Sequence, residues 1–180
     1  MQHILVKKYL EQHSLVESNL WSFNDFIGRR MQQIVNEVNE GIEQEDIEVK
    51  LGKIRVGKPD VIEADGSITI VTPTEARLRS LTYSAPVFVE LTVKYGNQTD
   101  SAEVDIGRMP VMVKSAVCNT SGLNRNQLIE NYIDPLDPGG YFIVNGNERI
   151  MVMTEDLASN QPFREDNRLG TIVRVFSPRA

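Results

Sequence analysis

The chain has 180 residues, of which 41% are hydrophobic and 24% charged, a formal net charge of −6 at pH 7, and one cysteine, Cys118. This composition is typical of a globular protein with a sizeable core, and it argues against disorder. A single cysteine excludes an internal disulfide framework and a cysteine-based zinc site, and it suits a reducing cytoplasm.

No apolar run approaches the ~18–20 residues that span a bilayer, and the first residues lack the layout of a signal peptide. The sequence therefore predicts a cytoplasmic protein with no membrane partner. The negative charge lies in residues 37–48, which hold six acids and no Lys or Arg. The remainder sums to zero, whereas a free-standing nucleic-acid binder usually carries a basic excess. A contact with nucleic acid must therefore come from one local face.

Two helices are expected near the start of the chain. Residues 2–13 carry a weak apolar stripe. Residues 22–39 carry a strong one, because their apolar side chains recur at spacings of three and four. Ser22 is the expected N-cap of the second helix, and Gly41 is its expected stop.

The next residues predict β-structure. Residues 47–51 and 54–56 alternate in opposite phase, so we expect a strand with a bulge at Gly52-Lys53. Asp65-Gly66 is a hairpin turn signal between two short apolar runs.

Residues 72–81 then predict a short helix, because Thr72 to Glu75 form a capping-box pattern with a proline at the first helical position. Three extended runs follow, at residues 87–95, 102–106 and 110–114. The last expected elements are a short helix, a helical turn and a strand, at residues 124–131, 154–157 and 169–176.

Periods of two and of 3.6 residues are intermixed along the chain, and hairpin turns imply antiparallel pairing. The predicted class is α+β, a mostly antiparallel sheet with hairpins plus N-terminal amphipathic helices. We expect one domain over residues 1–180, with a helical part at 1–41 and a mixed α/β part at 42–176.

Residues 141–153 predict a further hairpin. Asn145-Gly146 supplies two residues that tolerate positive φ, as a two-residue type I′ turn requires. Two Asp-Pro steps and a Gly pair precede it and force a sharp entry. One interpretation is a rigid finger that presents Arg149 to a partner. The alternative is a structural hairpin with a solvated tip.

The sequence offers no constellation of catalytic residues. It has no phosphate-binding Gly-Lys-Ser/Thr loop, no Gly-x-Ser-x-Gly elbow and no His-Glu-x-x-His motif. His3 and His13 stand ten residues apart, which is not a ligand spacing, and Cys118 has no activating motif. Two-metal nucleotidyl transfer needs clustered aspartates, and no such cluster occurs. We therefore expect the chain to be inactive alone.

Five segments together resemble the second-largest, beta-like subunit (B or B'') of multisubunit DNA-directed RNA polymerases, in its archaeal form. They occur in the order of that family. The segments are SFNDFI (22–27), LGKIRVGKP (51–59), EARLRSLTYSAP (75–86), IGRMPVMVKS (106–115) and GGYFIVNGNER (139–149).

The resemblance implies that the chain is the N-terminal part of this subunit and forms an incomplete protrusion, one wall of the main cleft. The family subunit is much longer, so a fragment or the leading piece of a subunit is expected. No cofactor is expected in this chain, and Mg²⁺ is expected on another subunit. The implied partners are the largest and the smaller polymerase subunits, the DNA template, the RNA–DNA hybrid, and initiation and elongation factors.

By this resemblance the hairpin at Asn145-Gly146 would lie near the RNA–DNA hybrid. Arg149 is the first candidate for a contact with nucleic acid, together with Asn145. Arg77, Arg79 and Lys114 are further candidates, each of which could instead pair with an acid inside the subunit. An alternative function is an assembly module that binds other polymerase subunits and does not touch nucleic acid.

Overall fold

The structure is a computed structural model, and it describes residues 2–39, 47–96, 98–168 and 170–177. The chain divides into a main unit, Met1–Ile150, and a C-terminal unit, Met151–Ala180. Residues 151–158, at the start of the C-terminal unit, are exposed and have no helix or strand. The single domain over residues 1–180 stays a prediction.

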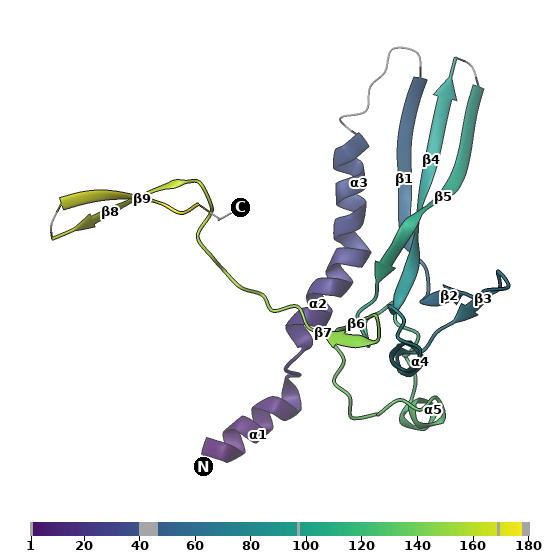
Figure 1. The fold of residues 1–180 in the computed structure, drawn as a ribbon, viewed down its shortest axis with the longest axis horizontal. Helices are drawn as coiled ribbons and strands as arrows, with labels where there is room; N and C mark the ends of the chain where they lie inside the picture. The colour runs from purple at the N-terminus through teal and green to yellow at the C-terminus, as the bar shows by residue number, and fades with distance from the viewer. Residues whose placement is uncertain (1, 40–46, 97, 169, 178–180) are drawn as a thin grey trace. The chain divides into compact units, whose positions relative to one another are not determined.

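The helices of the main unit are α1 (Gln2–Gln12), α2 (Glu17–Asp25), the π-helical turn η1 (Phe26–Arg30), α3 (Met31–Asn39), α4 (Pro73–Leu78) and α5 (Arg125–Glu130). Figure 1 shows α2, η1 and α3 running on as one long helix. The helix expected over 22–39 is confirmed, but Ser22 is not its N-cap. The helix begins five residues earlier, at Glu17, whose negative charge interacts favourably with the positive end of the helix dipole. The stop expected at Gly41 lies outside the described residues.

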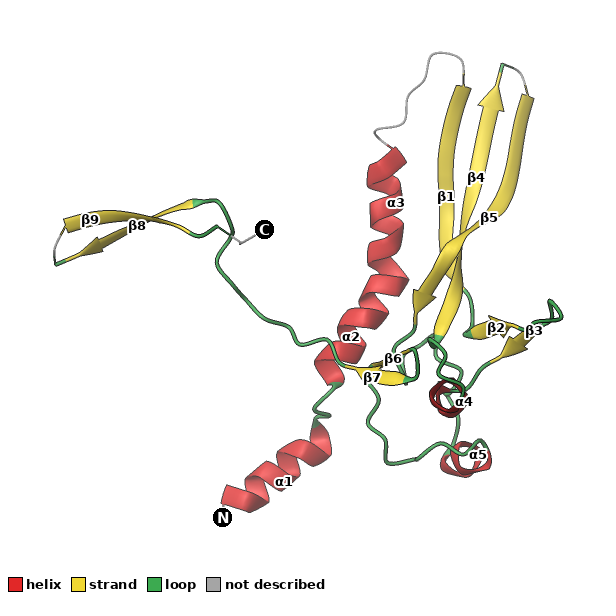
Figure 2. Cartoon of the chain, viewed as in Figure 1, coloured by secondary structure: helices red, strands yellow, loops and turns green. Residues whose placement is uncertain are grey.

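The strands of the main unit are β1 (Ile47–Val56), β2 (Asp60–Ile62), β3 (Ile68–Ile70), β4 (Ser84–Tyr95), β5 (Gln98–Pro110), β6 (Phe142–Val144) and β7 (Asn147–Arg149). The largest sheet has the order β1-β4-β5 and is antiparallel throughout, while β2-β3 and β6-β7 are two-stranded hairpins (Figure 2). This arrangement confirms the predicted α+β class.

The bulge predicted in β1 is confirmed, because the pairing with β4 shifts between Leu51 and Ile54. Amide side chains of α3 bond the backbone there. Asn39 donates to the carbonyl of Leu51 at 2.6 Å and accepts from its N–H at 2.7 Å. Gln32 donates to the carbonyl of Gly52 and accepts from the N–H of Ile54, both at 3.1 Å. The long helix is therefore fixed to the sheet at the irregular point of the strand.

Some expected elements differ from the structure. Strand β5 is longer than the run predicted over 102–106, because it pairs with β4 along its whole length. The extended run expected over 110–114 ends in a turn at Lys114, whose φ is +64°. The helical turn expected over 154–157 is wrong; these residues are exposed and extended, so no apolar face is buried to stabilise a helix. In the C-terminal unit, β9 (Gly170–Val175) confirms the last predicted strand and pairs with β8 (Pro162–Asn167).

The core of the main unit lies at the base of the large sheet, where β4 begins and β5 ends. Its fully buried side chains include Tyr83, Val111, Cys118 and Ile143. Backbone hydrogen bonds join three chain segments there: Tyr83 N–H donates to Ile143 at 2.9 Å, and Val111 N–H donates to Tyr83 at 2.8 Å. The β6–β7 hairpin is thus attached directly to the core.

Candidate nucleic-acid interface

The β6–β7 hairpin has the turn that its sequence predicts. Asn145 has φ +50° and Gly146 has φ +75°, so both central residues lie in the left-handed region. The tip is anchored, however. The N–H of Gly146 donates to the carbonyl of Leu81 at 2.9 Å, and the N–H of Asn145 donates to the hydroxyl of Thr82 at 3.2 Å. The hairpin is therefore held against the residues that follow α4, and it is not a free finger.

Arg149 ends β7 and is exposed. It lies opposite Phe142 in the hairpin register, and the ring of Phe142 packs edge-on against Phe23 of α2, with centroids 5.4 Å apart. Within the described ranges, the side chain of Arg149 makes no ion pair. Arg149 is therefore a cation on a rigid base, with its charge directed to solvent.

Arg77 is bonded within the chain. Its Nε lies 2.8 Å from Glu148 and its Nη2 lies 3.6 Å from Asp137, and it also donates to the hydroxyl of Tyr141. The guanidinium stands 5.6 Å from the centre of the Tyr141 ring. Burial, followed by the hydrogen bond to Asp137, raises the pKa of Tyr141. Arg77 therefore joins α4 to β7 and to the loop before β6. This pairing inside the chain is the alternative to a contact with nucleic acid that the sequence left open.

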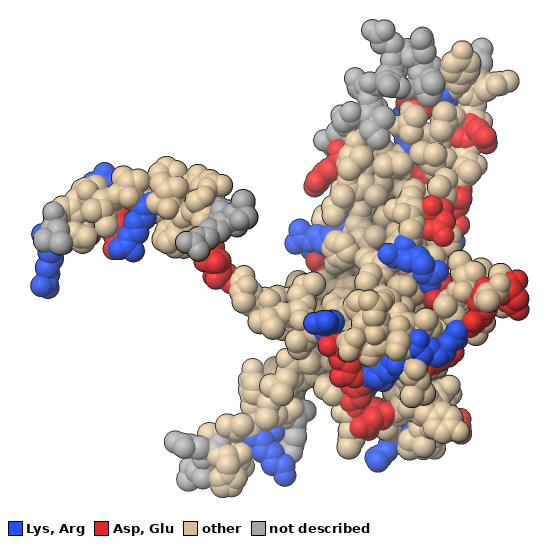
Figure 3. All heavy atoms as spheres, viewed as in Figure 1, with Lys and Arg blue, Asp and Glu red and all other residues tan. Residues whose placement is uncertain are grey.

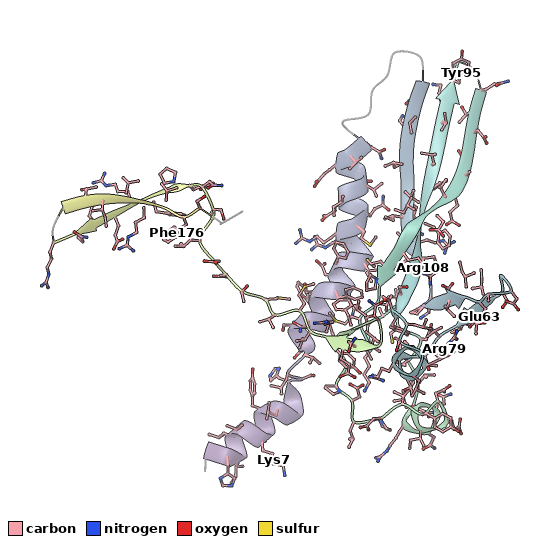
Figure 4. All side chains as sticks on the ribbon, in the orientation of Figure 1. Lys7, Glu63, Arg79, Tyr95, Arg108 and Phe176 are labelled. Carbon is pink, nitrogen blue, oxygen red and sulfur yellow. The ribbon has the colours of Figure 1, made fainter. Side chains whose placement is uncertain are left out.

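Arg79 is also paired within the chain (Figure 4). Its two terminal nitrogens each lie 2.8 Å from a carboxylate oxygen of Glu63, and Nη1 lies 2.9 Å from Glu75. The hydrogen bonds from Arg79 hold the pKa of Glu63 below its usual value of 4.5. The same bonds raise the pKa of Arg79.

Lys114 donates through Nζ to the backbone carbonyl of Asp137, and its own backbone has positive φ. The structure thus gives Arg77, Arg79 and Lys114 partners inside the main unit and brings Arg77 to the β6–β7 hairpin. Their role toward nucleic acid stays a prediction, as does that of Arg149 and Asn145.

We expect Arg79→Gln to move the pKa of Glu63 back up toward 4.5. A carboxylate whose folded pKa is depressed stabilises the fold above its unfolded pKa, and this contribution is lost as pH falls through the folded pKa. The variant should therefore lose less stability than the parent on acidification below pH 4.5. The measurement is a carbon-detected NMR titration of the Glu63 carboxyl group. The control is Arg125→Gln, which changes an exposed residue on α5. An unchanged Glu63 titration in Arg79→Gln would contradict Arg79 as the cause of the lowered pKa.

Sequence reasoning missed a second cationic feature, the pair Arg29 and Arg30 in η1. Both side chains bond Asp25, at 2.8 Å for Arg29 and 3.2 Å for Arg30. The i,i+4 spacing of Asp25 and Arg29 is visible in the sequence. The π turn that brings Arg30 to the same carboxylate is not.

Two general observations bear on function. Among the residues that the structure describes, no group of three or more His, Cys, Asp or Glu side chains is placed to hold a metal ion. Across the same residues, no helix is both long and apolar enough to cross a membrane.

The fold and the site define an α+β module with a rigid, Arg-bearing hairpin fixed to its core. The sequence model of the family described as RNA polymerase beta subunit matches residues 14–162. The chain therefore belongs to the RNA polymerase beta subunit family.

Several archaeal proteins are similar to the chain. It is 46% identical to DNA-directed RNA polymerase subunit Rpo2N of Methanocaldococcus jannaschii, over 97% of this chain and 37% of that protein. It is 41% identical to Rpo2N of Halobacterium salinarum, over 97% of this chain and 37% of that protein. It is 42% identical to subunit Rpo2 of Saccharolobus solfataricus, over 93% of this chain and 15% of that protein. These matches confirm the predicted family and its archaeal form. The chain spans about a third of the Rpo2N relatives.

Proposed function

We propose that this chain is the N-terminal part of the second-largest subunit of a cytoplasmic archaeal RNA polymerase. In this role it forms a wall of the cleft and positions nucleic acid during DNA-templated transcription. The catalytic Mg²⁺ and the bond-making residues belong to another subunit, and this chain alone is inactive. Its other partners would be the remaining polymerase subunits and the initiation and elongation factors. Family membership and similarity to the archaeal subunits support the proposal.

The observation that best supports a contact with nucleic acid is the exposure of Arg149. The other candidate cations, Arg77, Arg79 and Lys114, already have partners inside the chain. Arg149 is exposed on a hairpin whose tip and core-facing side are both fixed. Because the backbone of this hairpin is already fixed, a contact with the sugar–phosphate backbone would have to order only the side chain of Arg149, whose guanidinium suits phosphate oxygens. Such a contact carries no base information, as transcription of any template requires.

The assembly module remains the second candidate, and a separate observation favours it. The residues that follow β7 form an exposed apolar run; Ile150, Met151, Val152 and Met153 are each 59–70% exposed. A run of this kind is typical of a surface that another polypeptide covers.

Arg149→Ala separates the two candidates. If Arg149 contacts a phosphate, the assembled polymerase should bind a DNA–RNA scaffold less tightly, and the slope of log affinity against log salt should fall by about one. The measurement is fluorescence anisotropy of a labelled scaffold across a series of KCl concentrations.

Arg125→Ala is the matched control for this experiment. Arg125 is exposed on α5, and no ion pair holds it within the described residues, so its removal makes the same change in charge elsewhere. An unchanged salt slope for Arg149→Ala, together with loss of a subunit from the purified enzyme, would favour the assembly module.

A further inference from the structure

The turn of the β6–β7 hairpin is chemically labile. Asn145-Gly146 is the single Asn-Gly step in the sequence. Asparagine is a thermolabile residue, and a glycine after it has no side chain to hinder the reaction that degrades it. The backbone nitrogen of the glycine attacks Cγ of the asparagine, the Cγ–Nδ2 bond breaks, and ammonia leaves with the proton of the attacking nitrogen. Water then opens the succinimide ring to aspartate or isoaspartate.

The fold requires this pair of residues at the tip of the hairpin. Both have positive φ, which Asn and Gly tolerate better than other residues. A side chain at position 146 would also collide with the backbone. An added Cβ would stand 2.8 Å from Cα of Ser80 and 3.2 Å from the carbonyl oxygen of Arg77. Replacement of Gly146 would therefore remove the labile step only at the expense of the packed tip.

The left-handed conformation of Asn145 itself opposes the reaction. In this region ψ is about +30 to +60°. For an L-residue, such a ψ places the next backbone nitrogen opposite Cβ across the Cα–C bond, whereas ring closure needs the two atoms on the same side. Asn145 must therefore leave the turn conformation before the nitrogen of Gly146 can reach Cγ.

Hydrogen bonds to the segment after α4 hold this conformation. The N–H of Gly146 donates to the carbonyl of Leu81 at 2.9 Å, so the attacking nitrogen keeps its proton. The hydroxyl of Thr82 accepts from the N–H of Asn145 and donates to its side-chain oxygen, both at 3.2 Å. One hydroxyl thus fixes the backbone and the amide of the same residue. We call these three hydrogen bonds the tip clamp.

Deamidation would change the charge and the shape of the hairpin. It replaces the neutral amide of Asn145 by a carboxylate, and isoaspartate also adds a backbone atom that a two-residue turn does not accommodate. Figure 3 shows a basic side chain on the surface at β7, beside acidic ones. Arg149 is the basic residue of that strand. A new negative charge on the same hairpin would therefore weaken its attraction for anions.

We propose that the tip clamp protects Asn145 from spontaneous deamidation, and that Asn145 is the site at which this chain deamidates when the clamp opens. The proposal is independent of any contact with nucleic acid, because it rests on the turn and its hydrogen bonds. Local opening of this kind is governed by the contacts that close it. The rate of deamidation at Asn145 should therefore report the stability of the clamp.

The first test compares the assembled polymerase with the same enzyme unfolded in urea, both in mildly alkaline buffer. Digestion followed by peptide mass spectrometry measures the conversion of Asn145 to aspartate and isoaspartate with time. We expect conversion in the unfolded enzyme and far less in the folded one. Equal rates in the two states would overturn the proposal.

Two substitutions at position 82 test the hydroxyl. Thr82→Val keeps the shape of the side chain and removes both of its hydrogen bonds, so the conversion of Asn145 should be about five-fold faster. Thr82→Ser keeps the hydroxyl and should stay near the parent rate. A rate in Thr82→Val at or below that of the parent would show that the hydroxyl does not protect the amide, and the proposal would fail.

Two controls separate the clamp from stability elsewhere. Gly122→Ala strains a turn outside the clamp, since Gly122 has φ +80°, and it should leave the rate at Asn145 unchanged. Asn160 is exposed and also left-handed, but it lies in the C-terminal unit, so its own rate should not respond to Thr82→Val. If Gly122→Ala accelerates the conversion of Asn145 as much as Thr82→Val does, global unfolding controls the reaction and the local clamp is overturned.

Discussion

Gly139→Ala should destabilise the chain by about 2–5 kcal/mol. Gly139 has φ +71°, and a left-handed backbone costs an L-residue about 1–2 kcal/mol. A methyl group there would also stand 2.7 Å from the carbonyl oxygen of Val113 and 2.7 Å from Cβ of Lys114. Overpacking of this kind costs about 1–3 kcal/mol. The backbone of Val113 cannot move away, because its carbonyl accepts from Gly140 N–H at 3.0 Å.

Gly122→Ala is the matched control for this prediction. Gly122 has φ +80° but open space where the methyl group would stand, so only the backbone cost applies. Urea unfolding of the two variants and the parent, followed by circular dichroism, gives the free energies of unfolding. Equal losses in the two variants would show that φ alone requires glycine at position 139, and that close packing against Val113 does not.

Local turn chemistry explains which elements the sequence could predict. The Asn145-Gly146 turn, the bulge at Gly52 and the Thr72 cap each depend on residues within four positions of one another. The side chain of Thr72 indeed accepts from the N–H of Glu75 at 3.2 Å. The helix predicted over 124–131 begins with a reciprocal capping box, in which Asn124 is the N-cap. Short-range conformational preferences decide these features before any tertiary contact forms.

The candidate site could be predicted only in part, because its partners are remote in the sequence. Arg77 pairs with Glu148, which lies 71 positions away, and Asn145 bonds Thr82, 63 positions away. The sequence identified the basic residues and the hairpin, but it could not show which cations the fold neutralises. The start of the helix at Glu17 also depends on a remote residue. Val16 packs so closely against Gly140 that a methyl group added to Gly140 would stand 2.6 Å from Cβ of Val16. Tertiary packing therefore overrides the local capping signal at Ser22.

Tyr83→Ala should destabilise the chain by about 3–5 kcal/mol, the usual cost of removing a buried aromatic ring. Tyr83 is fully buried, and its hydroxyl accepts from the N–H of Asn119 at 2.9 Å and lies 3.3 Å from the sulfur of Cys118. Burial raises the pKa of this phenol, so it stays neutral. The side chain of Asn119 in turn donates to the carbonyls of Pro59 and Val71, both at 2.7 Å. The ring thus supports the loop that holds the base of the β2–β3 hairpin.

Tyr83→Phe separates the contribution of the ring from that of the hydroxyl. It keeps the packing but leaves the N–H of Asn119 without its acceptor, which costs about 1–3 kcal/mol. Tyr132→Ala is the control, since that ring is 86% exposed and its removal should change stability by less than about 0.5 kcal/mol. Thermal unfolding of the three variants should therefore rank Tyr83→Ala below Tyr83→Phe, and Tyr83→Phe below Tyr132→Ala. If Tyr83→Phe proves as stable as the parent, the hydroxyl does not fix the Asn119 loop, and the ring acts by packing alone.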